Sequence, residues 1–319
     1  MKYSSRVPCW SVLIVTIIPM LGLLISCNAQ KADPDFHATV DRPAYLHEHP
    51  KVIIDEAHNN IHKADGTYRP FAELLMRDGY SVSANRRQFS SNTLEGFDIL
   101  VISNAKGKEH KYDPAFTIEE CDVVERWVKN GGSLLLVADH YPLGSAAEIL
   151  SLRFGISMSK GETSDSLHYD TSSRDKSQLL FSRENGLLGD HPILWGRDSS
   201  ERIAQVVTFT GQSLRGPTES IPLLALANSA TDQVPDSIWE EREWIFFSNT
   251  YTRFGEPVSA AGRAQGIALP FARGRVVVLG EAAMLTAQVS EDDRFGMQVP
   301  GNDDRQFALN VMHWLSRLL

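Results

Sequence analysis

The chain has 319 residues, of which 42% are hydrophobic, and it carries a formal net charge of −9. The length and the ordinary hydrophobic content fit a globular protein of one large or two small domains. The negative charge opposes long-range attraction to nucleic acid or to anionic lipid surfaces, although a local basic pocket for an acidic ligand stays compatible with it.

The first 27 residues have the layout of an export signal. Lys2 and Arg6 give a basic start, an apolar stretch follows over residues 12–25, and Ser26 precedes Cys27. This order predicts a secretory signal peptide over residues 1–26. The alternative is an uncleaved membrane anchor, because the apolar stretch is near the lower limit for a spanning helix.

The residues LISC at 24–27 resemble the lipobox of bacterial lipoproteins. The resemblance implies cleavage before Cys27 and a lipid such as palmitate on its thiol, so that a membrane becomes the partner of the mature chain. Asn28 rather than Asp follows the cysteine. This favours the outer membrane of a bacterial cell envelope.

Removal of 26 residues leaves a mature chain of 293 residues with 29 basic and 40 acidic side chains, a net charge of −11. Cys9 leaves with the signal, so Cys121 is the one thiol besides Cys27, and no internal disulfide is expected. Residues 28–50 are polar, carry three prolines and lack periodicity. Together with the lipidated Cys27 they predict a tether over 27–50, and its 23 residues beyond the cysteine reach about 75 Å at ~3.3 Å per residue.

From Lys51 onward, predicted strands alternate with predicted helices. The strands cover 52–54, 80–83, 97–104 and 133–139, and the helices cover 70–78, 118–129 and 145–154. Thr117 and Glu120 form a capping box at the start of the second helix. That helix has an apolar face made of Ile118, Cys121, Val124, Trp127 and Val128.

The second half of the chain is less regular. It predicts an exposed loop over 159–178, strands over 203–209, 221–227 and 274–281, and a last helix over 303–318. One face of that helix carries Phe307, Val311, Trp314, Leu315 and Leu318. The alternation of apolar strands with helices predicts an α/β fold with a mostly parallel sheet covered on both faces.

Polar residues follow the predicted strands at the end where open parallel sheets bind ligands. The candidates for catalysis are His140, Asp139, Glu281 and His58, and the candidates for ligand binding are Asp55, Asn59, Asn104, Tyr68 and Gln288. We expect Asp139 and His140 to form the floor of one site. At least three of Asp55, His58, Asp139, His140 and Glu281 should then lie within about 8 Å of one another beside a pocket.

Structural alternatives stand beside these roles. Asp139 and His140 form either a general base or a metal ligand with its orienting carboxylate, or they cap the following turn. We expect one to face the site and the other to brace a loop, because neighbours on a strand point in opposite directions. Glu281 either serves the site or accepts hydrogen bonds from amides of the next turn.

A metal site is a further alternative. His58 and His62 are four residues apart, and with His140, Asp139 or Glu281 they could supply three ligands for a hydrolytic metal. The segment that holds the first two histidines has the character of a loop, so a polar pocket rim is the simpler interpretation. The sequence indicates no particular cofactor.

Several segments together resemble an uncharacterised domain family of the class I glutamine-amidotransferase-like superfamily. They are DEAHNN at 55–60, GGSLLLVADH at 131–140, ERI at 201–203, TFTG at 208–211, GEAAM at 280–284 and LNVMHWL at 309–315. The resemblance covers about 50–319 and implies one domain over 51–319, a three-layer flavodoxin-like sandwich. Some similar domains are joined to unsaturated glycuronyl hydrolases in bacteria that degrade acidic polysaccharides.

The superfamily also implies a test for activity. True amidotransferases place a nucleophilic cysteine in a Gly-x-Cys-x-Gly turn after the strand that follows the Gly-Gly pair. Here residues 138–142 read ADHYP, and the spacing of Cys121 puts it on the inner face of a helix. Thiol-based hydrolysis of glutamine is therefore not expected.

Two functions from different classes remain, together with a plainer one. The first is binding of a small polar or sugar-derived ligand in polysaccharide handling, which rests on analogy with the fold. The second is a hydrolase, metal-assisted or not, that uses His140, Asp139, His58 and Glu281. The third is a surface scaffold with a degenerate site.

The lipobox leads to a direct test. Replacing Cys27 by Ala should abolish incorporation of labelled palmitate, because the lipid is attached to the thiol of this residue. Metabolic labelling of cells that express the full chain measures this. Undiminished label in the variant would contradict lipidation at Cys27.

Overall fold

The computed structural model describes residues 30–107, 113–244, 247–291 and 293–319. The signal-peptide residues and Cys27 lie outside these ranges, so the predictions about export and lipidation stay predictions. Within the described ranges, no helix combines the length and the apolar character that crossing a membrane requires.

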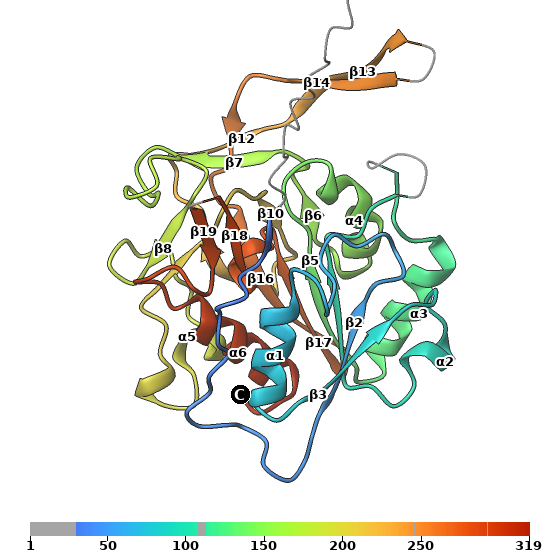
Figure 1. Ribbon diagram of the computed structural model, residues 1–319, viewed down its shortest axis with the longest axis vertical. Coiled ribbons are helices and arrows are strands. Elements are labelled where there is room, and N and C mark those ends of the chain that lie inside the picture. The colour runs from blue at the N-terminus through green and yellow to red at the C-terminus, as the bar shows by residue number, and fades with distance from the viewer. Residues whose placement is uncertain (1–29, 108–112, 245–246, 292) are drawn as a thin grey trace, which may run out of the picture.

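A mixed sheet of nine strands forms the centre of the described domain (Figure 1). Its strands lie in the order β3 (Ser81–Asn85), β2 (Lys51–Asp55), β4 (Ile99–Ser103), β5 (Ser133–Val137), β17 (Gly274–Leu279), β16 (Ala264–Phe271), β10 (Leu214–Arg215) and β6 (Ser157–Met158), and β11 (Ile221–Ala225) also pairs with β16.

The sheet is parallel over one half and antiparallel over the other. Neighbours from β3 to β17 run parallel, whereas β17 with β16, β16 with β10 and β11, and β10 with β6 run antiparallel. The predicted mostly parallel sheet is therefore wrong for the second half. Only residues 272–273 separate β16 from β17, and so short a connection permits an antiparallel pair alone.

Helices cover both faces of the parallel half. They are α1 (Arg69–Arg77), α2 (Ser91–Leu94), α3 (Ile118–Lys129), α4 (Leu143–Ser151), α5 (Pro192–Trp195) and α6 (Asp304–Leu315). Alternate residues of β4 enter two hydrophobic clusters: Ile99 and Val101 join the cluster with α1, α5 and α6, and Leu100 and Ile102 join the cluster with α3 and α4. This alternation follows from the period of two along a strand.

Two predicted helix faces need correction. The capping box of Thr117 and Glu120 is present at the start of α3, and Cys121 is buried as predicted, but Ile118 is 58% exposed. The last helix ends at Leu315, and all of its residues from Phe307 onward are buried. It has no polar face because Asn310 and His313 find buried partners in backbone carbonyls and in Asp78.

Smaller sheets and 3₁₀ turns complete the domain. They comprise β1 (Lys31–Ala32) with β18 (Ala287–Ser290) and β19 (Asp293–Gly296); β7 (Glu162–Asp165) with β12 (Ala230–Gln233) and β15 (Val258–Ser259); β8 (Leu180–Ser182) with β9 (Gln205–Val207); the hairpin β13 (Pro235–Trp244) with β14 (Phe247–Phe254); and η1 (Leu152–Phe154), η2 (Ser199–Glu201) and η3 (Ala283–Leu285). The predicted loop 159–178 thus contains β7, where Thr163 and Asp165 are buried.

The segment 30–50, predicted as part of a tether, packs on the domain. β1 pairs with β18, and the side chain of Phe36 joins the first hydrophobic cluster. The amide of Ala44 donates to Asp78 Oδ1 at 2.8 Å, and the rings of Tyr45 and Tyr80 meet edge to face. The described part of this segment is therefore fixed to the body of the protein.

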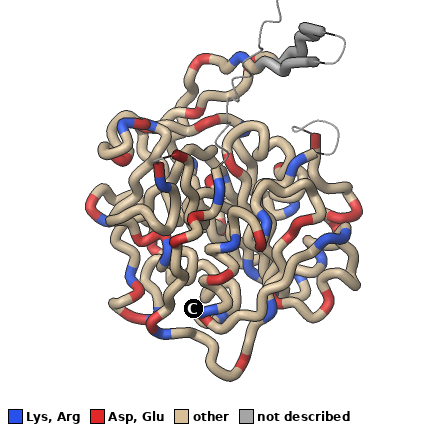
Figure 2. Tube along the Cα trace, viewed as in Figure 1, with Lys and Arg blue, Asp and Glu red and all other residues tan. Residues whose placement is uncertain are grey.

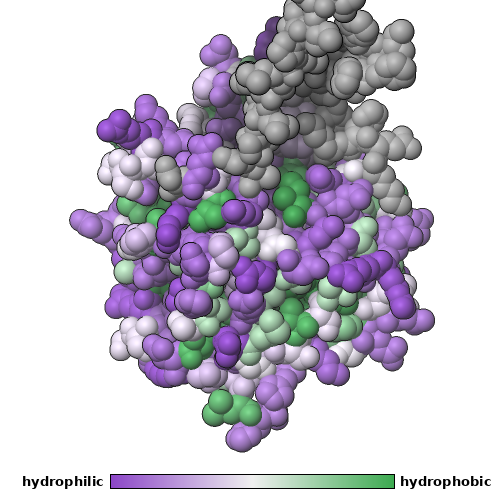
Figure 3. Space-filling model, in the orientation of Figure 1, coloured by the Kyte–Doolittle hydropathy of each residue, from purple (hydrophilic) through white to green (hydrophobic). Residues whose placement is uncertain are grey.

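Charge and hydropathy are mixed over the surface. In Figure 2, basic and acidic residues alternate along the trace without one sign gathering on the visible side. The face in Figure 3 is mostly hydrophilic with scattered apolar residues. The visible described surface therefore presents neither a broad basic stripe nor a broad apolar face.

Trp314 provides a test of the packing. Its ring is buried against His191 and Arg275, so Trp314→Ala should lower the free energy of unfolding by about 3–5 kcal/mol. Urea unfolding measures this. The matched variant is Trp127→Ala on α3, whose half-buried ring predicts a smaller loss. Equal midpoints for Trp314→Ala and the wild type would contradict the placement of α6.

Candidate functional site

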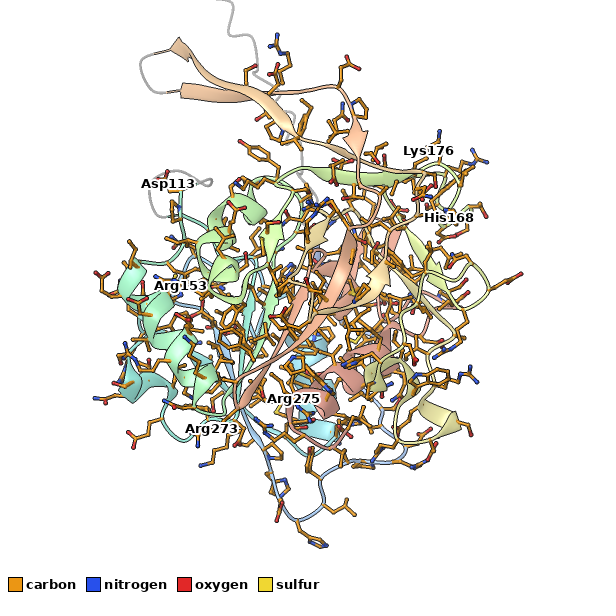
Figure 4. The ribbon with its side chains drawn as sticks, turned by 180° about the vertical axis from the view of Figure 1, so that it is seen from behind. Asp113, Arg153, His168, Lys176, Arg273 and Arg275 are labelled. Atoms are coloured by element: carbon orange, nitrogen blue, oxygen red, sulfur yellow. The ribbon has the colours of Figure 1, made fainter. Side chains whose placement is uncertain are left out.

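The carboxyl ends of β2, β4, β5 and β17 lie at one edge of the sheet. In Figure 4, Arg275 near the start of β17 lies at the lower end, whereas His168 and Lys176, which follow β7, lie at the upper end. The backbone joins this edge to the start of β7, because Tyr141 N donates to Gly161 O at 3.2 Å. The predicted site residues thus meet the segment around β7.

Asp139 and His140 form a hydrogen-bonded pair just beyond β5. Asp139 Oδ1 accepts from the backbone amide of His140 at 2.8 Å and lies 2.9 Å from His140 Nδ1. The two side chains therefore approach each other, and the prediction that they point apart is wrong. The reason is that β5 ends at Val137, so strand alternation no longer applies.

The pair is the exposed part of this edge. The side chain of His140 is 42% exposed and that of Asp139 is 12% exposed. The hydrogen bond to Asp139 raises the pKa of His140, burial opposes the rise, and the charges of Asp139 and Glu162 and the backbone of Thr210 add to it. The carboxylate thus shifts His140 toward the imidazolium form and holds the ring in one orientation.

Gln212 positions this pair and was not predicted. Its Nε2 donates to the carbonyls of Ala138 at 2.8 Å and Asp139 at 2.9 Å, and its Oε1 accepts from the amide of Lys160. The side chain is fully buried. A Cβ at Gly144 would overlap the Gln212 amide, so α4 can approach only because that residue is glycine. Nothing in the local sequence marks this glutamine.

Glu281 has the structural role given above as its alternative, because it accepts hydrogen bonds from amides of the next turn. It is fully buried and accepts hydrogen bonds from the amides of Ala283 and Met284, which open η3. Burial, followed by the charge of Asp139, raises the pKa of Glu281 well above its usual value, against the effect of these amides. The protonated acid is therefore favoured, and the charge of Asp139 contributes to this shift.

Tyr68 and His62 line the buried side of the same neighbourhood. Tyr68 donates to Ala282 O at 3.3 Å and accepts from Ser103 Oγ at 2.8 Å. His62 stacks on the Tyr68 ring with a centroid distance of 4.6 Å. Burial lowers the pKa of His62 to about 4, with Asp139 acting in the opposite sense. The neutral ring is thus favoured near pH 7.

Left-handed backbone conformations gather at this edge. Asn104, directly after β4, has φ = +46° and accepts from the amide of Asp139 through Oδ1 at 2.9 Å. The exposed Asn59 has φ = +52°, and Thr210, whose backbone acts on His140, has φ = +74°. Asparagine tolerates this region, but for a β-branched residue it is a strained outlier of the kind found at functional sites.

Asp55 and His58 belong to a separate buried network. His58 Nδ1 lies 2.8 Å from Asp55 Oδ2, and Nε2 lies 2.9 Å from Glu120 Oε1. The imidazole is enclosed between the rings of Phe89 and Phe116 at 4.7 and 4.8 Å. These phenylalanines belong to the hydrophobic cluster of α3 and α4, whereas Tyr68 belongs to the opposite cluster.

The predicted five-residue site therefore divides into two groups. The charge of Asp139 acts on both His140 and Glu281, whereas His58 bonds to Asp55 on one side and to Glu120 on the other. The sequence missed this partner because Glu120 was assigned to the capping box alone, and it does both: Oε2 accepts from Thr117 N and Oε1 faces His58. A carboxylate serving a helix terminus and a distant histidine leaves no signature in sequence spacing.

The structure also differs from two further expectations, the ligand-binding role of Gln288 and the alternative of a metal site that includes His58. Gln288 lies in β18, where its Nε2 donates to Thr286 Oγ1, and no hydrogen bond among the described residues joins it to Asp139 or His140. Both ring nitrogens of His58 already face carboxylates, so this residue cannot complete the predicted metal site. Within the described ranges, no group of three His, Cys, Asp or Glu side chains has the arrangement to hold a metal ion.

Comparison with solved structures shows the fold. The mmIFT52 N-terminal domain aligns with a TM-score of 0.57 at 13% identity, over 83% of this chain and 97% of that domain. A ThuA-like protein from Parabacteroides merdae aligns at 0.43 and 12% identity, over 84% and 90%. A second ThuA-like protein, from Bacteroides uniformis, aligns at 0.39 and 11% identity, over 86% and 94%.

No family model and no curated protein matches the chain. At these identities, the similarity to the mmIFT52 domain establishes a shared α/β architecture and carries no statement about activity. The chemistry of this protein has to be argued from its own residues.

The buried Asp55–His58–Glu120 network predicts a pH-dependent contribution to stability. Burial alone would lower the pKa of His58, but Asp55 and Glu120 together raise it. Burial would raise the pKa of Glu120, but hydrogen bonds from Thr117 and His58 lower it. The contribution of His58 to the free energy of unfolding is complete below about pH 6.5 and is lost as pH rises through the pKa of His58 in the folded state. The contribution of Glu120 to this free energy is present above about pH 4.5 and is lost as pH falls through the pKa of Glu120 in the folded state.

His58→Gln should therefore destabilise the fold most between about pH 4.5 and 6.5. Breaking one side of a buried ion pair costs about 3–5 kcal/mol. Urea unfolding from pH 4 to pH 9 measures the difference from the wild type. The control is His37→Gln, an exposed histidine for which no such maximum is expected. A difference that is flat across this range would mean that the network carries no charge.

Proposed function

We propose that the chain binds a small polar ligand, such as a sugar derivative, at the edge formed by Asp139, His140 and the backbone of Thr210. One observation carries the proposal: His140 is half-exposed and oriented, while the ionisable groups behind it, His62 and Glu281, are buried. Polar groups at a strand edge that face outward from a buried, hydrogen-bonded support are typical of binding sites in α/β sheets.

The chemistry of the pair selects the class of ligand. The His140 imidazolium offers an N–H donor, and the Asp139 carboxylate offers Oδ2 as an acceptor that makes no hydrogen bond within the described residues. Sugar hydroxyl groups can both donate and accept hydrogen bonds, so they can satisfy both groups. The resemblance to domains joined to glycuronyl hydrolases favours the same class and supports a role in polysaccharide handling.

The same proposal extends to the family and the location of the chain. We infer a flavodoxin-like sandwich of the glutamine-amidotransferase-like superfamily that lacks the nucleophilic cysteine. Support comes from the hydrophobic clusters on both sheet faces and from Asp139–His140 at the place of the elbow. Cys121 is buried in α3, and burial raises the pKa of its thiol to about 11. The lipobox supports a protein anchored in the bacterial envelope, in the outer membrane.

A hydrolase is the second candidate, and the Asp139–His140 hydrogen bond favours it. A carboxylate bonded to Nδ1 fixes the tautomer and orientation of a histidine that acts as general acid or base. His140 would then donate a proton to a bound sugar derivative or accept one from it. Turnover of the ligand separates this candidate from simple binding.

The test uses the full chain and two matched variants. His140→Gln should weaken binding of a neutral or acidic saccharide about tenfold or more, because one hydrogen bond to a charged group is worth about 1.5–3 kcal/mol. Thermal shift and calorimetry against a saccharide panel measure the affinity. The control is His168→Gln, since His168 is also a partly exposed histidine paired with an aspartate at 3.0 Å.

The pH dependence gives a second reading of the same experiment. Because the pKa of His140 is raised, affinity should be complete at slightly acidic pH and fall as pH rises through that pKa. Product formation during the titration would identify the hydrolase. If no saccharide binds the wild type, or if both variants bind equally well, the proposed ligand site is wrong and the edge is a structural turn.

A further inference from the structure

Two arginines stack on one exposed tryptophan outside the site described above. The guanidinium carbon of Arg183 lies 4.1 Å from the centroid of the Trp195 ring, and that of Arg202 lies 4.5 Å from it. The two guanidinium carbons are therefore at most 8.6 Å apart, the sum of these distances. Trp195 ends α5 and is 40% exposed, so the cluster is open to solvent.

The two arginines differ in how they are held. Arg183 Nε donates to Ile203 O at 2.7 Å, and its Nη2 donates to Leu194 O. These bonds fix its guanidinium plane and leave Nη1 with no hydrogen bond within the described ranges. Arg202 is exposed, and in the described part of the chain its guanidinium donates no hydrogen bond. One cation is thus rigid, and the other is free to adjust.

Asp190 offsets the charge of this pair only in part. Within the described residues, neither arginine forms an ion pair, and the nearby Asp190 accepts from Trp195 Nε1 at 2.7 Å. Burial and the charge of Arg202 lower the pKa of Arg183, with Asp190 opposing them. The two like charges therefore repel each other, and a bound anion would relieve the repulsion.

We propose that Arg183, Arg202 and Trp195 form a binding site for a small oxyanion, a carboxylate or phosphate group carried on a larger ligand. The guanidinium fork matches the oxygens of such groups in pairs. The exposed part of the indole offers an apolar surface for the carbon skeleton next to the anion. This site shares no residue with the Asp139–His140 edge and stands independently of the function proposed there.

A purely structural role explains the arrangement less well. One arginine over the ring would suffice for a cation–π contact, which contributes about 0.5–1 kcal/mol at an exposed position. A second arginine adds repulsion, and no ion pair within the described ranges compensates for it. On a chain with a net charge of −9, these two arginines make a local positive site.

The experiment titrates the full chain with sodium phosphate and, separately, with sodium glucuronate, at constant ionic strength set with sodium chloride. Calorimetry gives the dissociation constants. Arg202→Gln should weaken binding of the anion about tenfold or more. The matched control is Arg126→Gln, because Arg126 is an exposed arginine of α3 and should leave the affinity unchanged. Arg202 is chosen over Arg183 because its side chain makes no backbone hydrogen bond that the fold requires.

The two anions separate the sources of the oxyanion. Binding of phosphate that Arg202→Gln weakens supports a phosphorylated ligand, and the same result with glucuronate supports a carboxylate. The proposal is overturned if neither anion binds the wild type, or if wild type, Arg202→Gln and Arg126→Gln respond equally. An equal response would mean that the anion binds elsewhere on the protein.

Discussion

The geometry of the carboxyl edge depends on one buried amide, the side chain of Gln212. Its backbone N–H donates to Gly280 O at the end of β17, and its side chain holds both carbonyls that precede His140. It therefore ties the parallel half of the sheet to the antiparallel half. A Cβ at Gly280 would overlap the Gln212 carbonyl, so the two halves can meet this closely only at a glycine. Loss of the amide would leave two buried carbonyls without a donor, which costs about 1–3 kcal/mol for each.

Burial determines which groups at this edge carry charge. His62 and Glu281 lie behind the surface, and desolvation favours the neutral form of each. Only the exposed His140 is supported in its charged form, by the carboxylate beside it. The Asp139–His140 pair thus stands beside buried groups that are shifted toward their neutral forms, and Glu162 adds a further negative charge to its surroundings.

The sequence predicts the features that follow from local periodicity. The strand predicted over 133–139, which the structure ends at Val137, the capping box at Thr117 and the buried Cys121 all depend on spacing within one element, and the structure contains them. The pairing of His58 with Glu120 was missed, because it joins residues 62 positions apart through the direction of two side chains. The strand β16 was also missed: β17 follows it directly in the chain, but its partners on the other side, β10 and β11, come from distant parts of the chain.

If Cys27 carries lipid, the pairing of β1 with β18 limits the distance between the folded domain and the membrane. Four chain steps separate Cys27 from Lys31, the first residue of β1, and they span at most about 14 Å. A free tether of 23 residues would have allowed about 75 Å. The folded body would then lie close to the bilayer, and the short connection would restrict its rotation. A force on the lipid anchor would act first on the two-residue strand β1. If β1 separated from β18, the chain after it would become a longer connection to the membrane.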